Sequence, residues 1–365
     1  MGGVLKTSYQ SVSDTGNIQK TRRESGAPPT TEVTRLRAWL RMKEYYQRFC
    51  EKFLRNSRRL TDFFPIAIAF SVIIVFAGSF LSLFIIKATL SGLIAKITGG
   101  DAALGQFLSD YFLFIGIWIF IILDLILNKH NRPMFKHLLP NKKGNTLKGF
   151  IIGVLLGFGC NGLCVLLSIL LGDIKLSYNG IRPVVLIAFM VSVFIQSSAE
   201  ELVDRLFLYS KLRRRYKHAA FAIFVNAITF AYMHISNPGF TLIAGTQIFL
   251  VGLIFSLFVY YYDSLWAAMS FHATWNFTQN LIFGLPNSGI APAYSIFKLD
   301  TASAKDGIFY NVEFGVEGSV GACFVLLALC VAVYLKNKNN PEKTDIWAPY
   351  DVPKTPEAPL EEVQE

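Results

Sequence analysis

Six side chains that could take part in acid–base or hydrogen-bonding chemistry lie inside long apolar stretches of this 365-residue sequence: Glu200, Glu201, Arg205, His234, His272 and Asn276. Ionisable groups within a bilayer cost free energy and by default indicate a functional site. Each alone also has a structural explanation, since a single histidine or asparagine often hydrogen-bonds a neighbouring membrane helix. Because the six occupy three neighbouring apolar stretches, we expect them to converge on one site.

The first of these stretches places two carboxylates in different surroundings. On a helix, Glu201 and Arg205 are four residues apart and can form an ion pair. Glu200 points about 100° away from Glu201, and Asp204 follows four residues later on the side of Glu200. We therefore expect Arg205 to neutralise Glu201 while Glu200 faces a cavity.

These side chains suit hydrolysis of an amide without a protein nucleophile. Glu200 in a dry cavity could act as a general base on water, with a histidine beside it sharing the proton. The second histidine and Asn276 could donate hydrogen bonds to a developing oxyanion. Glu200, His234 and His272 could instead bind a divalent metal such as zinc.

Motifs of other hydrolases that work in membranes are absent from the sequence. It contains no HExxH of a zinc protease, no GxSxG of a serine hydrolase and no GxGD of an aspartyl protease. The five cysteines show no spacing typical of a zinc site and are expected to be apolar filling residues.

The composition is that of an integral membrane protein. Hydrophobic residues make up 53% of the chain and charged residues only 16%, against about 25% charged residues in soluble proteins. The predicted fold is all-α, with about eight transmembrane helices around a polar intramembrane cavity. The expected spans are 64–86, 107–127, 149–171, 184–209, 219–235, 246–262, 265–284 and 319–335.

The net charge of +10 reports the orientation of these spans. Most of the 35 Lys and Arg fall in the two terminal segments and in the stretches 128–148 and 211–217, which alternate along the chain. Loops rich in Lys and Arg face the cytoplasm. We therefore predict a multi-pass protein of the cell membrane with both termini cytoplasmic, and nucleic-acid binding becomes an unfavoured interpretation.

The segments outside the spans have separate predictions. Residues 1–62 form a basic cytoplasmic segment without a signal peptide, in which 1–33 are expected to be disordered. Within it, 34–60 predict an amphipathic helix, either lying on anionic lipid or simply cytosolic. Residues 63–336 form the transmembrane domain, and 337–365 are expected to be a disordered cytoplasmic tail.

One inconsistency concerns depth in the membrane. By helical rise, Glu200 lies about 24 Å from the outer end of span 184–209, which places it near the cytoplasmic face. His234 lies about 22 Å from the inner end of span 219–235, near the outer face. If the two share a site, the first span tilts or protrudes, or the second begins earlier, around Arg215.

Three motifs resemble those of the CAAX protease and bacteriocin-processing (CPBP, or Abi) family of intramembrane proteases. EExxxR is matched from Glu200 to Arg205, FxxxH from Phe230 to His234, and HxxxN from His272 to Asn276. They occur in the family's order, within a motif core at 190–280. One departure is Leu206, where the family commonly has a glycine after the arginine.

The resemblance implies roles for these residues. It implies a helical core with a conical cavity in which Glu200 activates water with help from His234. It also implies that His272 and Asn276 form the oxyanion site, and that Glu201 and Arg205 support the architecture, with Glu201 a candidate to assist catalysis. The better-understood members are glutamate-dependent, so no cofactor is expected, with zinc as the alternative.

The favoured function is an intramembrane endopeptidase acting on a membrane-associated or lipidated peptide or protein. Such an enzyme could mature a signalling or bacteriocin peptide or confer bacteriocin self-immunity. One alternative is a catalytically quiet membrane regulator, or an immunity protein, that binds a membrane partner such as a sensor kinase. Another is a transporter with Glu200 as a proton or ion site, although no inverted halves or interrupted helices are visible.

Overall fold

The computed structural model describes residues 31–55, 59–340 and 344–350. They fall into two compact units, Met1–Phe53 and Leu54–Glu365. Most of segment 1–33 and the last part of segment 337–365, both predicted to be disordered, lie outside the described residues.

The described residues of the first unit, 31–53, form the helix α2, Thr31–Phe53. Its aromatic residues Trp39 and Tyr46 are exposed among basic residues, which suits the predicted contact with anionic lipid without testing it. The helix ends earlier than the predicted 34–60, because Leu54 leaves helical geometry and forms an antiparallel bridge with Tyr216.

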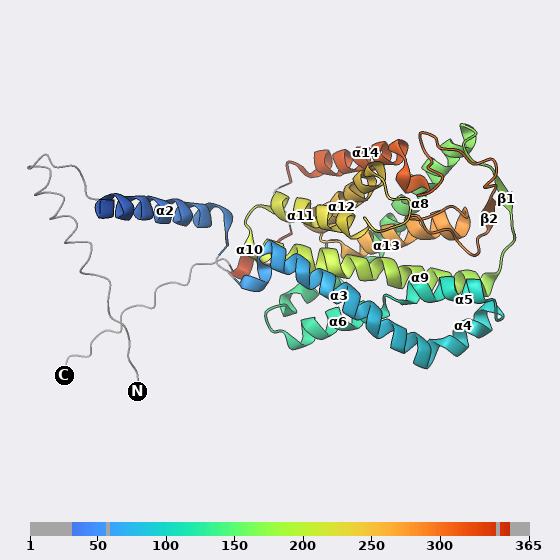
Figure 1. The fold of residues 1–365 in the computed structure, drawn as a ribbon, viewed down its shortest axis with the longest axis horizontal. Coiled ribbons are helices and arrows are strands. Elements are labelled where there is room, and N and C mark those ends of the chain that lie inside the picture. The colour runs from blue at the N-terminus through green and yellow to red at the C-terminus, as the bar shows by residue number, and fades with distance from the viewer. Residues whose placement is uncertain (1–30, 56–58, 341–343, 351–365) are drawn as a thin grey trace, which may run out of the picture. The chain divides into compact units, whose positions relative to one another are not determined.

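The second unit is mostly helical and has almost no sheet (Figure 1). In its described residues, three α-helices continue directly into a π-helical segment. These segments are Ile86–Leu90, Leu202–Leu208 and Thr278–Ile282. A two-stranded antiparallel sheet pairs β1 (Leu176–Tyr178) with β2 (Phe297–Leu299). The principal helices are α3 Phe64–Ile85, α4 Ser91–Thr98, α5 Ala102–Phe112, α6 Ile115–Leu127, α7 Phe135–Leu138, α8 Leu147–Leu170, α9 Pro183–Glu201, α10 Tyr209–Arg215, α11 Ala219–Met233, α12 Leu242–Tyr262, α13 Leu265–Phe277 and α14 Val320–Asn337.

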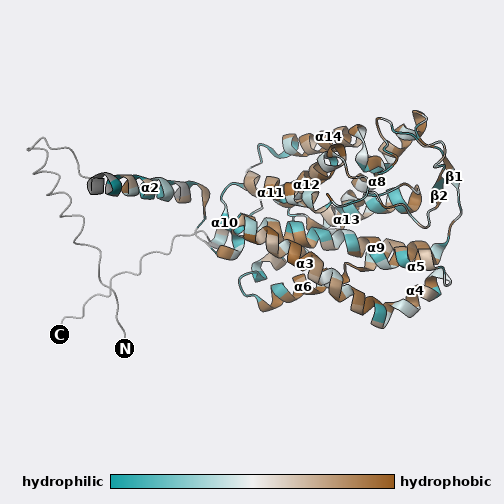
Figure 2. Cartoon of the chain, in the orientation of Figure 1, coloured by the Kyte–Doolittle hydropathy of each residue, from teal (hydrophilic) through white to brown (hydrophobic). Residues whose placement is uncertain are grey.

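Within the described residues, six helical stretches are long and apolar enough to cross a membrane. Helix α11 is apolar but spans only 15 residues, and α13 with its π-helical extension is not among the six. Eight crossings therefore stay a prediction. Apolar side chains such as Phe76 on α3 and Leu155 on α8 are exposed, and Figure 2 shows hydrophobic residues along these helices. The six stretches are Phe64–Thr98, Ala102–Leu127, Leu147–Leu170, Pro183–Arg215, Leu242–Tyr262 and Val320–Asn337.

The hairpin between α10 and α11 removes the inconsistency in depth. The expected end of a span at residue 209 is wrong, since the helix continues through a π-helical segment to Arg215. Glu200 then lies 15 residues before Arg215, and His234 lies 15 residues after Ala219, where α11 begins. Both therefore lie about 22 Å from the turn, and two antiparallel helices bring them to the same level.

The helix extends this far because its basic residues are buried in ion pairs. Arg214 makes two contacts of 2.6 Å to the fully buried Asp62, and Lys211 lies 3.4 Å from the same carboxylate. Arg213 contacts Asp345 at 2.8 Å. The stretch 211–217, predicted to be a basic loop, is thus largely helix packed against acidic residues from both ends of the unit.

The segment 344–350 also differs from its prediction as part of a disordered tail. The Trp347 indole is buried and donates a hydrogen bond to the Ser210 carbonyl at 2.9 Å. Asp345 contacts Arg55 at 2.9 Å in addition to Arg213. Long-range ion pairs and one buried aromatic ring therefore fix a segment whose local composition is polar and proline-rich.

Two glycines on α8 allow α13 to approach closely. A Cβ atom added at Gly153 would lie 2.4 Å from the Ala267 carbonyl oxygen, and one at Gly157 would lie 2.4 Å from the Phe271 carbonyl oxygen. Small residues spaced four apart are a common way for membrane helices to pack backbone to backbone. This close contact fixes the rotation of α13 about its axis, and with it the face of the helix that carries His272.

Candidate active site

The two adjacent glutamates stand at the junction between the α-helical and π-helical parts of one passage. Glu200 and Glu201 are the last residues of α9, and the π-helical segment Leu202–Leu208 follows directly. Such π-bulges often occur at functional sites. The two carboxylates diverge here as predicted: Glu201 is fully buried beside Arg205, while Glu200 lines a cavity.

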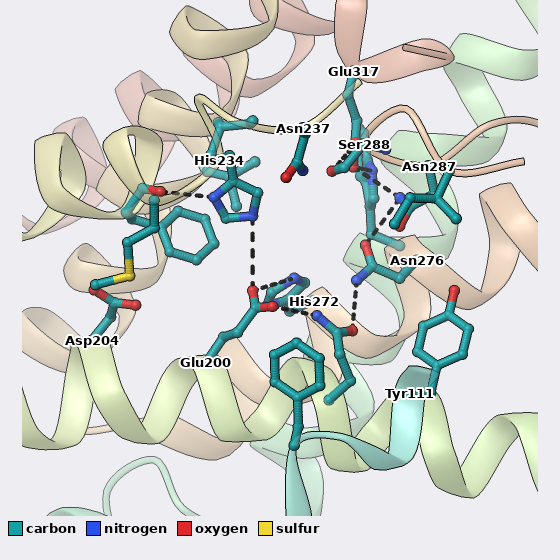
Figure 3. Close-up of a pocket in the computed structure, with 18 of the residues that line it drawn as sticks. Tyr111, Glu200, Asp204, His234, Asn237, His272, Asn276, Asn287, Ser288 and Glu317 are labelled. Carbon is teal, nitrogen blue, oxygen red and sulfur yellow. Dashed lines mark hydrogen bonds and ion pairs between the residues drawn. The ribbon is translucent and has the colours of Figure 1, made fainter. Parts of the chain in front are cut away.

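The cavity has a volume of about 290 Å³. Polar side chains enter it from α9, α11 and α13 and from the long connection between α13 and α14, as Figure 3 shows. Aromatic side chains including Phe230, Phe255 and Phe271 complete its wall. The structure therefore places a carboxylate and two histidines at the edge of a partly apolar chamber.

Glu200 has one engaged and one unengaged carboxylate oxygen. Its Oε1 accepts a hydrogen bond from Gln196, one turn earlier on α9. Its Oε2 is buried and has no hydrogen-bond partner among the residues that the structure describes. This second oxygen lies 4.0 Å from Nε2 of His234 and 3.8 Å from Nε2 of His272.

His234 is oriented by the first residue of its own motif. It caps the C-terminal end of α11, and its Nδ1 donates a hydrogen bond of 2.8 Å to the Phe230 carbonyl. A neutral His234 then has its lone pair on Nε2, facing Glu200. The Phe230 ring also lies 4.9 Å from the His234 ring and 4.3 Å from the Arg205 guanidinium. Phe230 therefore positions both the histidine and the arginine.

His272 joins the two glutamates. Its Nδ1 lies 2.9 Å from Oε1 of Glu201, and its Nε2 faces Glu200. The Nε2 atom of His272 carries a hydrogen in two cases. Either the ring is a doubly protonated imidazolium, or Glu201 holds the shared proton and donates it to Nδ1. The role of Glu201 is thus coupled to the hydrogen-bonding state of His272.

Arg205 is buried with no exposed surface, and Nη1 contacts Oε1 of Glu201 at 3.1 Å. Its guanidinium lies over the rings of Phe230 and Phe255, at 4.3 and 5.2 Å from their centroids. Asp204, which also lines the cavity, is held through its backbone carbonyl by the side chain of Asn226. The predicted ion pair is present, and it packs behind the lining residues Phe230, Phe255 and His272.

Asn276 lies one turn after His272 on α13 and is 5% exposed. Its Nδ2 donates hydrogen bonds of 3.2 Å to Gln196 and to Ser197, and its Oδ1 accepts one of 3.2 Å from Asn287. An oxyanion that binds to Asn276 must replace one of these two acceptors.

Sequence reasoning missed several residues that the fold brings to this cavity. Gln196 is visible in the sequence as a polar residue inside a span, which is a usable signal. Asn287, Ser288 and Glu317 belong to the connection before α14, where polar residues are ordinary. Burial raises the pKa of the Glu317 carboxyl, and hydrogen bonds from Ser288 act in the opposite direction.

A metal site was the alternative prediction for Glu200, His234 and His272. Among the residues that the structure describes, no group of three or more His, Cys, Asp and Glu side chains is arranged to hold a metal ion.

Residues 182–278 match the family model described as Type II CAAX prenyl endopeptidase Rce1-like. The match covers 97 of the 365 residues and confirms the predicted resemblance to the CPBP family over this segment. The match contains all three motifs, from Glu200 to Asn276, and excludes Glu317. No curated protein and no solved structure gives a match. Together with the six apolar helices, the Rce1-like segment indicates a multi-pass membrane protein and suggests CAAX-type protease activity.

Proposed function

We propose that this protein is a glutamate-dependent intramembrane endopeptidase that cleaves a membrane-associated or lipidated peptide or protein. The observation that carries the proposal is the position of Oε2 of Glu200, which lies within 4.0 Å of Nε2 of both His234 and His272 and has no hydrogen-bond partner within the described part of the chain. Polar atoms separated by more than 3.5 Å are often bridged by water. A water between Glu200 and His234 would meet an acceptor on each side.

Glu200 takes a proton from this water as the water oxygen attacks the scissile carbonyl carbon. The carbonyl π electrons move onto its oxygen, which becomes an oxyanion. Nε2 of His272 and the amide of Asn276 donate hydrogen bonds to this oxyanion, provided that Nε2 carries a hydrogen. The proton held by Glu200 then passes to the leaving amine as the C–N bond breaks.

Glu201 and Arg205 stabilise the arrangement without touching the substrate. Glu201 holds Nδ1 of His272, and Arg205 compensates the buried charge of Glu201. A carboxylate buried without such a partner would be costly. Zinc bound by Glu200, His234 and His272 is the alternative source of an activated water.

The substrate is proposed to be membrane-associated because the chamber is lined partly by aromatic rings and lies among apolar helices. The exposed aromatic residues of α2 would add contacts with anionic lipid. Both termini are proposed to be cytoplasmic, in the cell membrane, and nucleic acid is not a proposed partner.

A catalytically quiet regulator, for example a bacteriocin-immunity protein, is the second candidate. It is favoured by one observation, that both N–H groups of Asn276 already have acceptors within the protein. The two functions are separated by comparing the membrane peptidomes of native-host strains that carry wild type, Glu200→Gln or His234→Ala. Peptides that disappear in both variants support the protease, whereas unchanged peptidomes with correctly folded variants support the regulator.

A further inference from the structure

The carboxylate of Glu317 is the most completely hydrogen-bonded acidic group that lines the cavity. It is 5% exposed and lies in the short 3-10 helix Val316–Gly318, before α14. Oε1 accepts hydrogen bonds of 3.0 Å from the Trp275 indole and from Nδ2 of Asn287. Oε2 accepts two of 2.7 Å, from the backbone N–H and the hydroxyl of Ser288. An ionised carboxylate only accepts hydrogen bonds, so each polar neighbour of Glu317 must direct a donor toward it.

The acceptor-only carboxylate of Glu317 fixes the orientation of the Asn287 side-chain amide. An asparagine amide offers donors on one side and an acceptor on the other. Because Glu317 accepts, Asn287 must turn its Nδ2 toward Glu317, and its second N–H then points at Oδ1 of Asn276, 3.2 Å away. Figure 3 shows Asn287 between Glu317 and Asn276.

The same polarity continues through two further amides. Since Oδ1 of Asn276 accepts from Asn287, its Nδ2 faces the opposite way, toward Oε1 of Gln196. Gln196 in turn donates through Nε2 to Oε1 of Glu200. Reversing Asn276 alone would place acceptor against acceptor at Gln196 and donor against donor at Asn287, so its orientation is determined from both ends.

We infer that Glu317 is a positioning residue that acts through Asn287 to keep the N–H groups of Asn276, rather than its carbonyl oxygen, directed toward the reacting oxygen. This inference rests on the proposed function. Removal of one donor from an oxyanion site typically lowers kcat by about 100-fold or more. If the donor is kept but loses its orientation, we expect kcat to fall as well, by a smaller factor.

A second feature of the loop agrees with this role. Ser288 has a φ of 48°, a left-handed conformation that is unfavourable for a residue other than glycine. Strained residues persist where their surroundings over-determine them, and both hydrogen bonds to Oε2 of Glu317 come from Ser288. Glu317 thus also holds the adjoining wall of the cavity in place.

The test uses Glu317→Gln in the full-length protein, purified in detergent. Its substrate is a peptide whose processing in native membranes is lost on Glu200→Gln. A glutamine preserves the shape but cannot accept at both ends, so either Asn287 or Ser288 faces a donor. We expect kcat to fall roughly tenfold with KM within about twofold of wild type. Asn287→Ala should cause a similar fall, and the double variant should be no worse than the more impaired single variant.

The matched control is Glu313→Gln, the same substitution at an exposed glutamate of the same connection; its kcat should stay within about twofold of wild type. Thermal unfolding of each variant reports folding, and Asn287→Ala serves if Glu317→Gln does not fold. The inference is overturned if the folded variants keep wild-type kcat, or if Glu317→Gln lowers kcat equally in an Asn276→Ala background. If no peptide depends on Glu200, the proposed function itself fails.

Discussion

The Nε2 atom of His234 lies 4.0 Å from the Oε2 atom of Glu200, although 33 residues and a helical hairpin separate the two in sequence. The hairpin places them at equal distances from its turn. His234 cannot rotate its Nε2 away without losing the hydrogen bond from Nδ1 to Phe230. The relationship therefore results from helix lengths and from one local hydrogen bond.

The buried ion pair should be essential for stability. Arg205→Leu leaves Glu201 buried without its cationic partner, which typically costs about 3–5 kcal/mol. Glu201→Gln combined with Arg205→Leu should be less destabilised than Arg205→Leu alone, because no uncompensated charge remains. Chemical unfolding in detergent measures both. If Arg205→Leu unfolds at the same denaturant concentration as wild type, the ion pair does not stabilise the fold.

The close contact between α8 and α13 should be intolerant of side chains. Gly157→Val adds carbon atoms where a Cβ would already lie 2.4 Å from the Phe271 carbonyl oxygen. We expect a loss of about 1–3 kcal/mol together with lower activity, since α13 carries His272. Gly159→Val on the same helix is the control, because a Cβ there meets nothing within 4 Å. Equal stability of the two variants would show that the contact is not tight.

Activity should not require a metal. The purified protein is expected to keep its activity after incubation with EDTA or phenanthroline, because Glu200 and His234 provide the acceptors for water. Activity assays before and after chelation, with metal analysis of the same sample, measure this. Loss of activity that zinc restores would favour the metal mechanism with Glu200, His234 and His272 as ligands.

The charge distribution predicts a definite orientation. A reporter placed in residues 139–146, between α7 and α8, should report the cytoplasm, and one in residues 300–306, before α14, should report the opposite side. An enzymatic reporter that is active on only one side of the membrane distinguishes the two. The reverse pattern would show that the basic residues do not set the topology.

The sequence predicted the residues of the site better than the elements that carry them. Ionisable groups in apolar stretches and motif spacing are local signals, and they single out Glu200, His234 and His272. The continuation of the helix to Arg215 depends on Asp62 and Asp345, which are distant in sequence. From the sequence alone, a stretch with five basic residues looks like a loop, because its acidic partners are not known.

The same limit explains the other differences. Glu317 precedes a predicted span and resembles any polar residue at a helix end, so only the fold reveals its contact with Asn287. Trp347 lies in a polar, proline-rich segment, and its burial against Ser210 depends on the ion pairs of Asp345. Interactions between segments far apart in the chain leave no local pattern to predict them from.

The central claim is that Glu200 activates the attacking water, and Glu200→Gln tests it most directly. The measurement is the rate of peptide cleavage by purified wild-type and variant protein, with the exposed Glu313→Gln as a matched control. We predict that Glu200→Gln folds normally and cleaves roughly 100-fold or more slowly, while Glu313→Gln cleaves at the wild-type rate. A folded Glu200→Gln variant that cleaves as fast as wild type would contradict the account.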